Sequence, residues 1–385
     1  MIRNGEPLLG SKPSPSASLR VIEALRKLGP LTRRELREQT GYSRATVSQV
    51  TNQLIDSGTL DELGEWEPVD GPRTRGRPSA KVRLNPLRAT QAGLEIACNR
   101  MAFALCDNAG LLILSGSEPI SRKIGLPEQA NRLTAMVQRR AAEAGIDLAK
   151  LDRVVLGLPR SQFPEMSSAS QPGEAFRTTE PLIESLRQVI QGGFGAPLSL
   201  VNNTRMRALA EAQYFRDNES DLFFLGVDHE IIGALVLGGV LQNGSHGQAG
   251  DLGHVSVRLD GAPCRCGNRG CLEQVASMPA LLAVEGLADP GELTKGILAG
   301  GYAEPLANAI RGLSQATAAV VTFFNPGTLV LGGSVMQLPG FFQSAKLAVL
   351  GSVPGRISSS LQVEPAAGDG VSGAIGAMIL AFQSG

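Results

Sequence analysis

A short glycine-rich stretch between Gly250 and Glu273 constrains the fold of this 385-residue chain more than any other feature. It reads Gly-Asp-Leu-Gly-His, nine further residues, then Cys-Arg-Cys-Gly-Asn-Arg-Gly-Cys-Leu-Glu, and it holds three of the five cysteines. Three thiolates and one imidazole fill all four positions of a tetrahedral zinc site and leave none for a catalytic water. The spacing therefore predicts a structural Zn²⁺ site with these ligands: His254, Cys264, Cys266 and Cys271.

Such a site would carry a net negative charge, because three thiolates outweigh the charge of one divalent ion. Arg265 and Arg269 lie inside the cysteine-rich loop and are expected to offset it. The alternative interpretation of the stretch is a flexible loop with incidental cysteines.

The length of the chain suits two or three domains rather than one hydrophobic core. Its composition, with 43% hydrophobic residues, 46 glycines and few aromatic residues, is typical of a soluble α/β protein with many tight turns. The sequence predicts neither a membrane span nor a secretion signal, since it lacks long uncharged apolar runs. Reduced cysteines placed for metal favour a cytoplasmic location, and Cys98 and Cys106 lie in strand-like runs where we expect small core residues.

The formal net charge is zero, but the two parts of the chain differ in sign. Residues 1–88 contain 15 Lys and Arg against 10 Asp and Glu, so the remaining residues carry an equal excess of acidic side chains. A basic module joined to an acidic body indicates that only the first part contacts a polyanion such as DNA.

Apolar residues recur at helical spacing after a Ser- and Pro-rich arm, residues 1–17, which is expected to be mobile. A first helix is expected over 18–28, and a second opens at the capping box Thr-Arg-Arg-Glu of residues 32–35. A third helix is expected over 43–57. Three short helices with a Gly-Tyr-Ser turn before the third predict a helix-turn-helix, whose third helix enters the DNA major groove.

Polar side chains of the third helix are the candidate DNA contacts. They lie off the apolar stripe, carry donors suited to phosphates and bases, and are Ser43, Arg44, Thr46, Ser48 and Gln49. Arg44 and Gln49 are the best candidates for reading bases, because Arg pairs with guanine and Gln with adenine. A helical bundle that binds another protein is the alternative.

A basic Gly- and Pro-rich tip between two strand-like segments follows the third helix and resembles the wing of a winged helix. Its residues Arg75 and Arg77 are candidates for contact with backbone phosphates, or for lying along the minor groove. Phosphate contacts would make the affinity for DNA fall steeply with salt. We expect the DNA-binding domain to occupy residues 18–85.

The Gly-x-x-Gly-His motif, the Cys-x-Cys-Gly-x-x-Gly-Cys-Leu-Glu block and their spacing resemble the signature of the ROK family, which groups sugar-responsive bacterial repressors with sugar kinases. The resemblance implies an α/β fold in which a two-lobed, actin-like (ribonuclease H-like) sugar-kinase-type body follows the winged helix-turn-helix. The lobes are expected over 86–205 and 206–385. Apolar segments fit this order, with a three-strand meander over 92–114, a helix around 127–144 and strands at 154–158, 198–201 and 222–225.

Segments that match the kinase machinery of the family differ from it in composition. Glu95–Arg100 stands where a kinase of the family has Asp-x-Gly-Gly-Thr-Lys, so side chains replace the glycines that let backbone N–H groups approach a triphosphate. Gly226–Glu230 stands at the second phosphate turn, where two carboxylates would repel phosphate. Asn203 replaces the catalytic aspartate, and an amide cannot act as a general base. We therefore expect no kinase activity.

Positions that border the sugar in the family are partly kept. The resemblance assigns ligand contacts to Asn202, Asn203, Asp251, His254 and Glu273. Asp251 stands where glutamate is usual, and Asn203 can still hydrogen-bond a hydroxyl group. Arg160 departs from the family's Pro-Gly turn and is expected either to obstruct the pocket or to meet an anionic ligand. The effector is therefore open between a sugar, a phosphorylated sugar and none.

The sequence favours a DNA-binding transcriptional regulator that senses a sugar or sugar derivative through a catalytically degenerate kinase body. We expect this regulator to be a repressor. It is expected to bind a double-stranded operator as a homodimer or homotetramer. A sugar kinase with an added DNA-binding head is the alternative, and a protein-binding scaffold is a third class.

Overall fold

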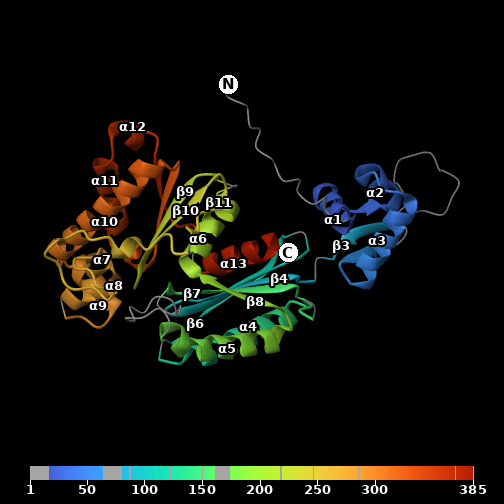
Figure 1. Cartoon of the computed structure of the whole chain (residues 1–385), viewed down its shortest axis with the longest axis horizontal. Helices are drawn as coiled ribbons and strands as arrows, with labels where there is room; N and C mark the ends of the chain where they lie inside the picture. Colours follow the sequence, from blue (N-terminus) through green and yellow to red (C-terminus); the bar gives the residue numbers. More distant parts are fainter. Residues whose placement is uncertain are drawn as a thin grey trace, which may run out of the picture. The chain divides into compact units, whose positions relative to one another are not determined.

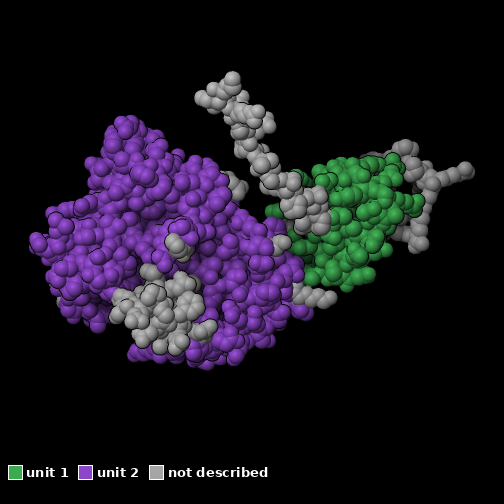
Figure 2. Space-filling model, viewed as in Figure 1, with its two compact units in different colours: residues 1–89, 107–111 green, residues 90–106, 112–385 purple. Residues whose placement is uncertain are grey.

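The computed structural model describes residues 17–63, 80–85, 88–108, 110–121, 123–149, 151–160, 174–216, 219–245, 247–284, 286–368 and 370–384. Residues 1–89 with 107–111 form one compact unit, and residues 90–106 with 112–385 form the other (Figure 2). The expected arm, apart from its last residue, lies outside the described residues, as do Arg75 and Arg77. The predicted boundaries of arm, head and lobes stay predictions.

Three helices pack on a three-stranded sheet in the first unit (Figure 1). Its elements are α1 (Ala17–Leu28), β1 (Leu31–Thr32), α2 (Arg33–Thr40), α3 (Arg44–Asp56), β2 (Leu60–Leu63) and β3 (Lys81–Leu84). β3 lies between β1 and β2 and is antiparallel to both. The buried side chains between helices and sheet are Val21, Leu25, Leu36, Val47, Val50, Leu60 and Val82. This is the winged helix-turn-helix fold that the sequence predicts.

Local capping signals set the bounds of α2 and α3. The Thr32 hydroxyl accepts a hydrogen bond from the Glu35 N–H, and the Glu35 carboxylate accepts one from the Thr32 N–H, so the predicted capping box is present. Gly41 ends α2 in the left-handed conformation, with φ 73°, which glycine adopts without steric cost. Ser43 then caps α3 by accepting from the Thr46 N–H. Each signal is confined to a few residues, which is why the sequence reveals it.

A five-stranded sheet forms the first lobe of the second unit, in the order β6-β5-β4-β7-β8. Its strands are β4 (Gln91–Ile96), β5 (Arg100–Cys106), β6 (Leu112–Pro119), β7 (Arg153–Leu158) and β8 (Leu198–Asn202). β4, β5 and β6 form the antiparallel meander that the sequence predicts, and β7 and β8 run parallel to β4. α4 (Leu126–Glu143) and α5 (Glu174–Phe194) cover one face of the sheet (Figure 1).

The second lobe repeats the same strand order as β11-β10-β9-β12-β13. Its strands are β9 (Leu222–Val227), β10 (Ile231–Leu237), β11 (Val240–Leu241), β12 (Thr328–Gly332) and β13 (Gln362–Pro365). Its helices are α7 (Glu273–Ala276), α8 (Met278–Val284), α9 (Pro290–Leu298), α10 (Ala303–Phe324), α11 (Phe341–Ser352) and α12 (Gly355–Ser358). The repeated topology is that of the two-lobed actin-like fold, as the sequence predicts.

Helix α6 (Asn203–Ala210) lies between the two sheets and contacts both. Its Met206 packs with Val155 of the first sheet, and its Ala208 packs with Phe224 of the second. The last helix, α13 (Ser372–Gln383), returns to the first sheet and packs against β4 and α6 (Figure 1). Side chains on α6 can therefore reach residues of both lobes.

Two expectations for cysteines have different outcomes. Cys106 is fully buried in β5, as expected for a small core residue. Cys98 is not in a strand, because β4 ends at Ile96, and it lies partly buried in the turn before β5. Among the described residues, no helix is both long enough and apolar enough to cross a membrane.

Replacing Gly93 by Ala should lower the stability of the second unit. A Cβ atom at this position of β4 would overlap the backbone of α13 at Ala374 and Met378, and backbone cannot rotate away. We expect a loss of up to about 3 kcal/mol, in the range for overpacking a core. Differential scanning calorimetry would measure the loss as a lower Tm.

Gly192 provides the matched control, because it is exposed near the end of α5 and a Cβ there meets no atom within 4 Å. Gly192→Ala should raise stability by up to about 1 kcal/mol through helix propensity. Equal Tm values for the two variants would contradict the packing of α13 on β4.

Candidate functional site

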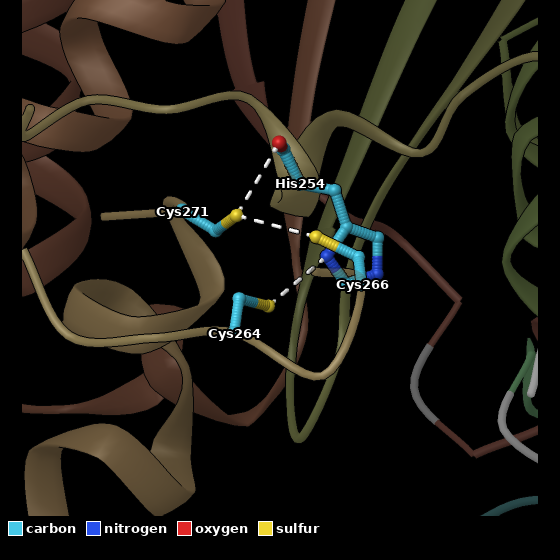
Figure 3. Close-up of side chains that lie close together, drawn as sticks. All are labelled: His254, Cys264, Cys266 and Cys271. Atoms are coloured by element: carbon cyan, nitrogen blue, oxygen red, sulfur yellow. Dashed lines mark hydrogen bonds between the residues drawn. The ribbon is translucent and has the colours of Figure 1, made fainter. Parts of the chain in front are cut away.

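The predicted zinc ligands come together in one cluster (Figure 3). His254 ends the short helix η4 (Leu252–His254), and the three cysteines follow on the loop that leads to α7. The four possible ligand atoms all lie within 4.8 Å of one another. Sequence spacing and folded structure therefore select the same four residues, His254, Cys264, Cys266 and Cys271.

Distances within the cluster suit a tetrahedral ion. Zinc with Zn–S near 2.3 Å and Zn–N near 2.0–2.1 Å places two sulfurs about 3.8 Å apart and a sulfur about 3.6 Å from the nitrogen. The sulfurs of Cys266 and Cys271 are 3.6 Å apart, and the Cys264 sulfur is 3.5 Å from Nδ1 of His254. The donor set and its spacing thus fit zinc bound by four protein ligands.

Backbone hydrogen bonds shape the loop around the cluster. The Cys264 N–H donates to the Asn268 carbonyl at 2.8 Å, and the Gly267 N–H donates to the Cys264 carbonyl at 3.0 Å. Gly270 has φ 65°, and a Cβ atom there would overlap the Arg258 carbonyl group. The glycines of the motif are therefore needed for the tight turn and for close approach of two backbone segments.

A bound cation would change the protonation of the cluster. Burial, followed by contacts with the other two thiols, raises the pKa of the Cys271 thiol to about 12. A bound divalent ion reverses this effect, because thiolate is the form that binds metal. The four residues would hold zinc in a structural role, with no position left for substrate.

A cavity of about 820 Å³ lies between the lobes beside the metal cluster. Glu273, the first residue of α7, contributes a carboxylate that accepts from the Ile231 N–H at 3.4 Å and pairs with Nη2 of Arg265 at 3.2 Å. Arg265 also lies 3.7 Å from Glu230, so it contacts carboxylates as well as lying in the cysteine loop. Burial raises the pKa of the Glu273 carboxyl. From the first lobe, Ala97 and Cys98 line the same cavity.

The predicted ligand contacts do not converge on this cavity. Glu273 lines it, whereas Asn203 lines a smaller adjoining cavity of about 150 Å³. Asn202 caps α6 by accepting from the Arg205 N–H at 3.1 Å. Asp251 lies 3.6 Å from Nε of Arg160, and His254 directs Nδ1 at the cysteine cluster. Contact of these five residues with a ligand stays a prediction.

The smaller cavity is lined by Arg207, a charged residue that no sequence motif singled out. Arg207 of α6 donates from Nη2 and Nε to the Glu95 carboxylate of β4, at 2.8 and 3.1 Å. Its Nη1 donates to Asp228 at 3.2 Å, and Asp228 also accepts from the Ser334 N–H at 2.7 Å. The available signal was the spacing of four residues from Asn203, which puts Arg207 on the same helix face.

Contacts with opposite charges determine the direction in which the pKa values of Arg207 and Asp228 shift. Burial alone would lower the pKa of Arg207, but Glu95 and Asp228 outweigh it and raise that pKa above its ordinary value. Burial likewise works to raise the pKa of Asp228, but Arg207 and the Ser334 N–H bring it below the usual range. Arg207 and Asp228 are therefore both charged near neutral pH.

In the first unit, the predicted DNA-contacting side chains differ in their exposure and in the hydrogen bonds that they form within the protein. The Ser43 hydroxyl caps α3 and lies 2.9 Å from the Thr46 hydroxyl, so these two groups bind each other. Arg44 and Gln49 are exposed on α3, and Ser48 is partly buried. Contact of all five residues with DNA stays a prediction.

Fold and site together define a two-lobed actin-like body with a Cys3His cluster, joined to a winged helix-turn-helix. Residues 132–384 match the model of the ROK family, which is more than half of the chain. The protein therefore belongs to the ROK family. It is 24% identical over 270 residues to the xylose repressor of Bacillus spizizenii, which covers 68% of this chain. The chain spans 66% of the length of that repressor.

Solved structures of the family share the fold. A crystal structure of a ROK family transcriptional regulator, a homologue of the Escherichia coli Mlc protein, covers 95% of both chains with a TM-score of 0.64 and 21% identity. The ROK hexokinase of Thermus thermophilus covers 76% of this chain and 98% of its own, with a TM-score of 0.60 and 26% identity. The family fold thus occurs with a regulator and with a kinase.

Replacing Cys266 by Ser should release the metal, because a serine hydroxyl is a poor zinc ligand beside two thiolates and an imidazole. Elemental analysis of purified protein should find about one zinc per wild-type chain and far less in the variant. Faster amide exchange in α7 would show that the wall of the larger cavity loosens with the metal.

Cys98→Ser is the matched control, since Cys98 lies outside the cluster, and it should retain the metal. Full metal content in the Cys266→Ser protein would mean that the cluster does not hold the ion.

Proposed function

We propose that this chain is a DNA-binding transcriptional regulator, acting as a repressor, whose ROK body senses a sugar or sugar derivative. The observation that carries the proposal is the winged helix-turn-helix in the same chain as the ROK body. Similarity to the xylose repressor supports it. A protein that only phosphorylated sugars would have no use for this head.

Helix α3 would read the operator from the major groove. Arg44 and Gln49 project from its first half, the part that meets base edges in this motif. Ser43, Thr46 and Ser48 would contribute phosphate or sugar contacts, and Arg75 and Arg77 of the wing would contact the neighbouring backbone. The excess of basic residues over 1–88 supports binding to a polyanion.

The body would bind its effector without transferring a phosphoryl group. Asn203 has an amide where a general base is needed, and Arg207 pairs with two carboxylates beside the turns 97–99 and 228–230. Carboxylates at the cavity of about 820 Å³ suit hydroxyl groups, because each can accept from neighbouring hydroxyls of a polyol. We infer that Glu273 contacts the ligand in this cavity and that Asn203 contacts it from the adjoining smaller one. Asp251, Asn202 and His254 would support them from the contact with Arg160, the helix cap and the zinc site.

Ligand binding between the lobes would change their closure and thereby the spacing of two DNA-reading heads in a homodimer. A homotetramer would contain two such pairs. Zinc would keep the cavity wall in shape, and the protein would work in the cytoplasm, where its operator lies and where thiols stay reduced.

A sugar kinase with an added DNA-binding head is the second candidate. Similarity to the Thermus thermophilus hexokinase favours it, because that enzyme shares the body fold at 26% identity. Asn203 and the side chains in the turn after β4 argue against it. The third class, a protein-binding scaffold, would be favoured if the head had no salt-sensitive affinity for DNA.

Arg44→Ala should weaken operator binding by about 1–3 kcal/mol, because a bidentate contact to guanine would be lost. Operator fragments would first be selected from genomic DNA, and affinity would be measured by fluorescence anisotropy over a range of salt concentrations. A panel of sugars and sugar phosphates would then be tested for release of the DNA.

Arg132→Ala, at an exposed position of α4 in the body, is the control and should leave the affinity unchanged. If wild-type protein had no salt-dependent affinity for any fragment, the proposed function would be wrong. If every panel compound left binding unchanged, the sensing part would be wrong.

The wild-type chain should transfer no phosphate from ATP to any hexose or amino sugar. Asn203→Asp should not restore transfer by itself, since Arg207 and the two turns still differ from a kinase site. A coupled assay of ADP release over a panel of sugars would measure both proteins. Turnover by the wild-type chain would favour the kinase and contradict our interpretation of Asn203.

A further inference from the structure

Arg207 joins parts of both lobes beside the smaller cavity, a place we call the cleft floor. Glu95 belongs to the first sheet, Arg207 to the central helix α6, and Asp228 to the turn between β9 and β10 of the second sheet. Asp228 also accepts from the N–H of Ser334, which follows β12. One guanidinium group thus connects the first sheet with two segments of the second.

The environment makes this connection costly to break. The Glu95 side chain is 1% exposed and that of Arg207 is 12% exposed, while Asp228 is 32% exposed at the edge of the cavity. A carboxylate as buried as Glu95 is stable only with a cation beside it. Because the guanidinium is planar and offers several donors, it can bind both carboxylates at once, which a lysine could not do as well.

The connection also adjoins the larger cavity. The cavities of about 150 and 820 Å³ share lining residues from the turn after β4 and from the turn that holds Asp228, namely Ala97, Cys98, His229 and Glu230. A ligand in the larger cavity would therefore touch the residues directly after Asp228. Any shift of that turn changes the distance between Asp228 and Arg207.

We propose that Glu95, Arg207 and Asp228 form an interlobe latch that keeps the body closed at the cleft floor without a bound nucleotide. In the latch, the Arg207 side chain makes the connection between the lobes that a bound ligand would otherwise make. Its regulatory consequence, that a ligand acts by moving the turn 228–230 against the latch, rests on the proposed function. The latch itself does not.

Amide hydrogen exchange of the full chain, without DNA or effector, tests the latch. Arg207→Met should speed exchange about tenfold or more in peptides covering 95–101, 226–232 and 332–336, because both lobes open at the cleft floor. A role confined to α6 would speed exchange in that helix alone. That outcome, or unchanged exchange in the three peptides, would overturn the latch.

Two further proteins keep the test decisive. Arg216→Met removes another arginine with a mostly buried side chain, whose Nη2 lies 3.3 Å from Glu211 and donates to the Pro365 carbonyl at 2.9 Å. Both partners lie outside the three peptides, so this variant should leave their exchange unchanged. If Arg207→Met fails to fold, the triple variant Glu95→Gln, Arg207→Met, Asp228→Asn leaves no uncompensated charge. It should fold and still exchange rapidly in all three peptides. Normal protection in the folded triple variant would overturn the proposal.

Failure of the latch and failure of the proposed function give different results. If operator binding and its release by a sugar are normal but amide exchange in the three peptides is unchanged by Arg207→Met, only the latch is contradicted. Rapid exchange in Arg207→Met together with no DNA binding by the wild type would support the latch and contradict the proposed repressor function.

Discussion

The segment from Asp251 to Glu273 depends on the contact between three thiols and one imidazole. Among its described residues, regular structure is limited to η4 and two isolated bridges, and Leu259 is almost fully exposed. Such a segment has little regular secondary structure to hold one conformation by itself. A cluster of four ligand atoms supplies the missing constraint, and it also fixes the start of α7, where the Glu273 carboxylate enters the cleft.

Local signals made much of the fold predictable. Thr32 and Ser43 cap helices through hydrogen bonds to residues three positions away, and Gly41 ends a helix with its own backbone conformation. The zinc cluster was predictable for a related reason, since its ligands are close in sequence and chemically selective. The strand order of the body was expected from the family resemblance, and the apolar segments alone would have been compatible with other α/β arrangements.

Non-local contacts set the limit of prediction from sequence. Glu95, Arg207 and Asp228 come from three separate elements, and their pairing depends on how two sheets pack around α6. Asn202 shows that one position can suit two roles, because its side chain caps the helix that follows while its contact with a ligand stays a prediction. Cys98 shows a second limit, since its apolar neighbours suggest a strand, but the strand ends two residues earlier. Pattern gives residue type and spacing, whereas side-chain direction depends on the tertiary structure.

The return of α13 to the first sheet has a consequence for biosynthesis. The head has its own core within the first ninety residues and can fold while the ribosome is still at work. The first lobe cannot be completed in that way, because α13, at Ser372–Gln383, packs on the β4 face around Gly93. Until those residues emerge, the nascent chain carries a nearly finished sheet with an open apolar face, a surface suited to chaperones and prone to aggregation. Premature termination of translation would leave a folded head attached to an incomplete, aggregation-prone body.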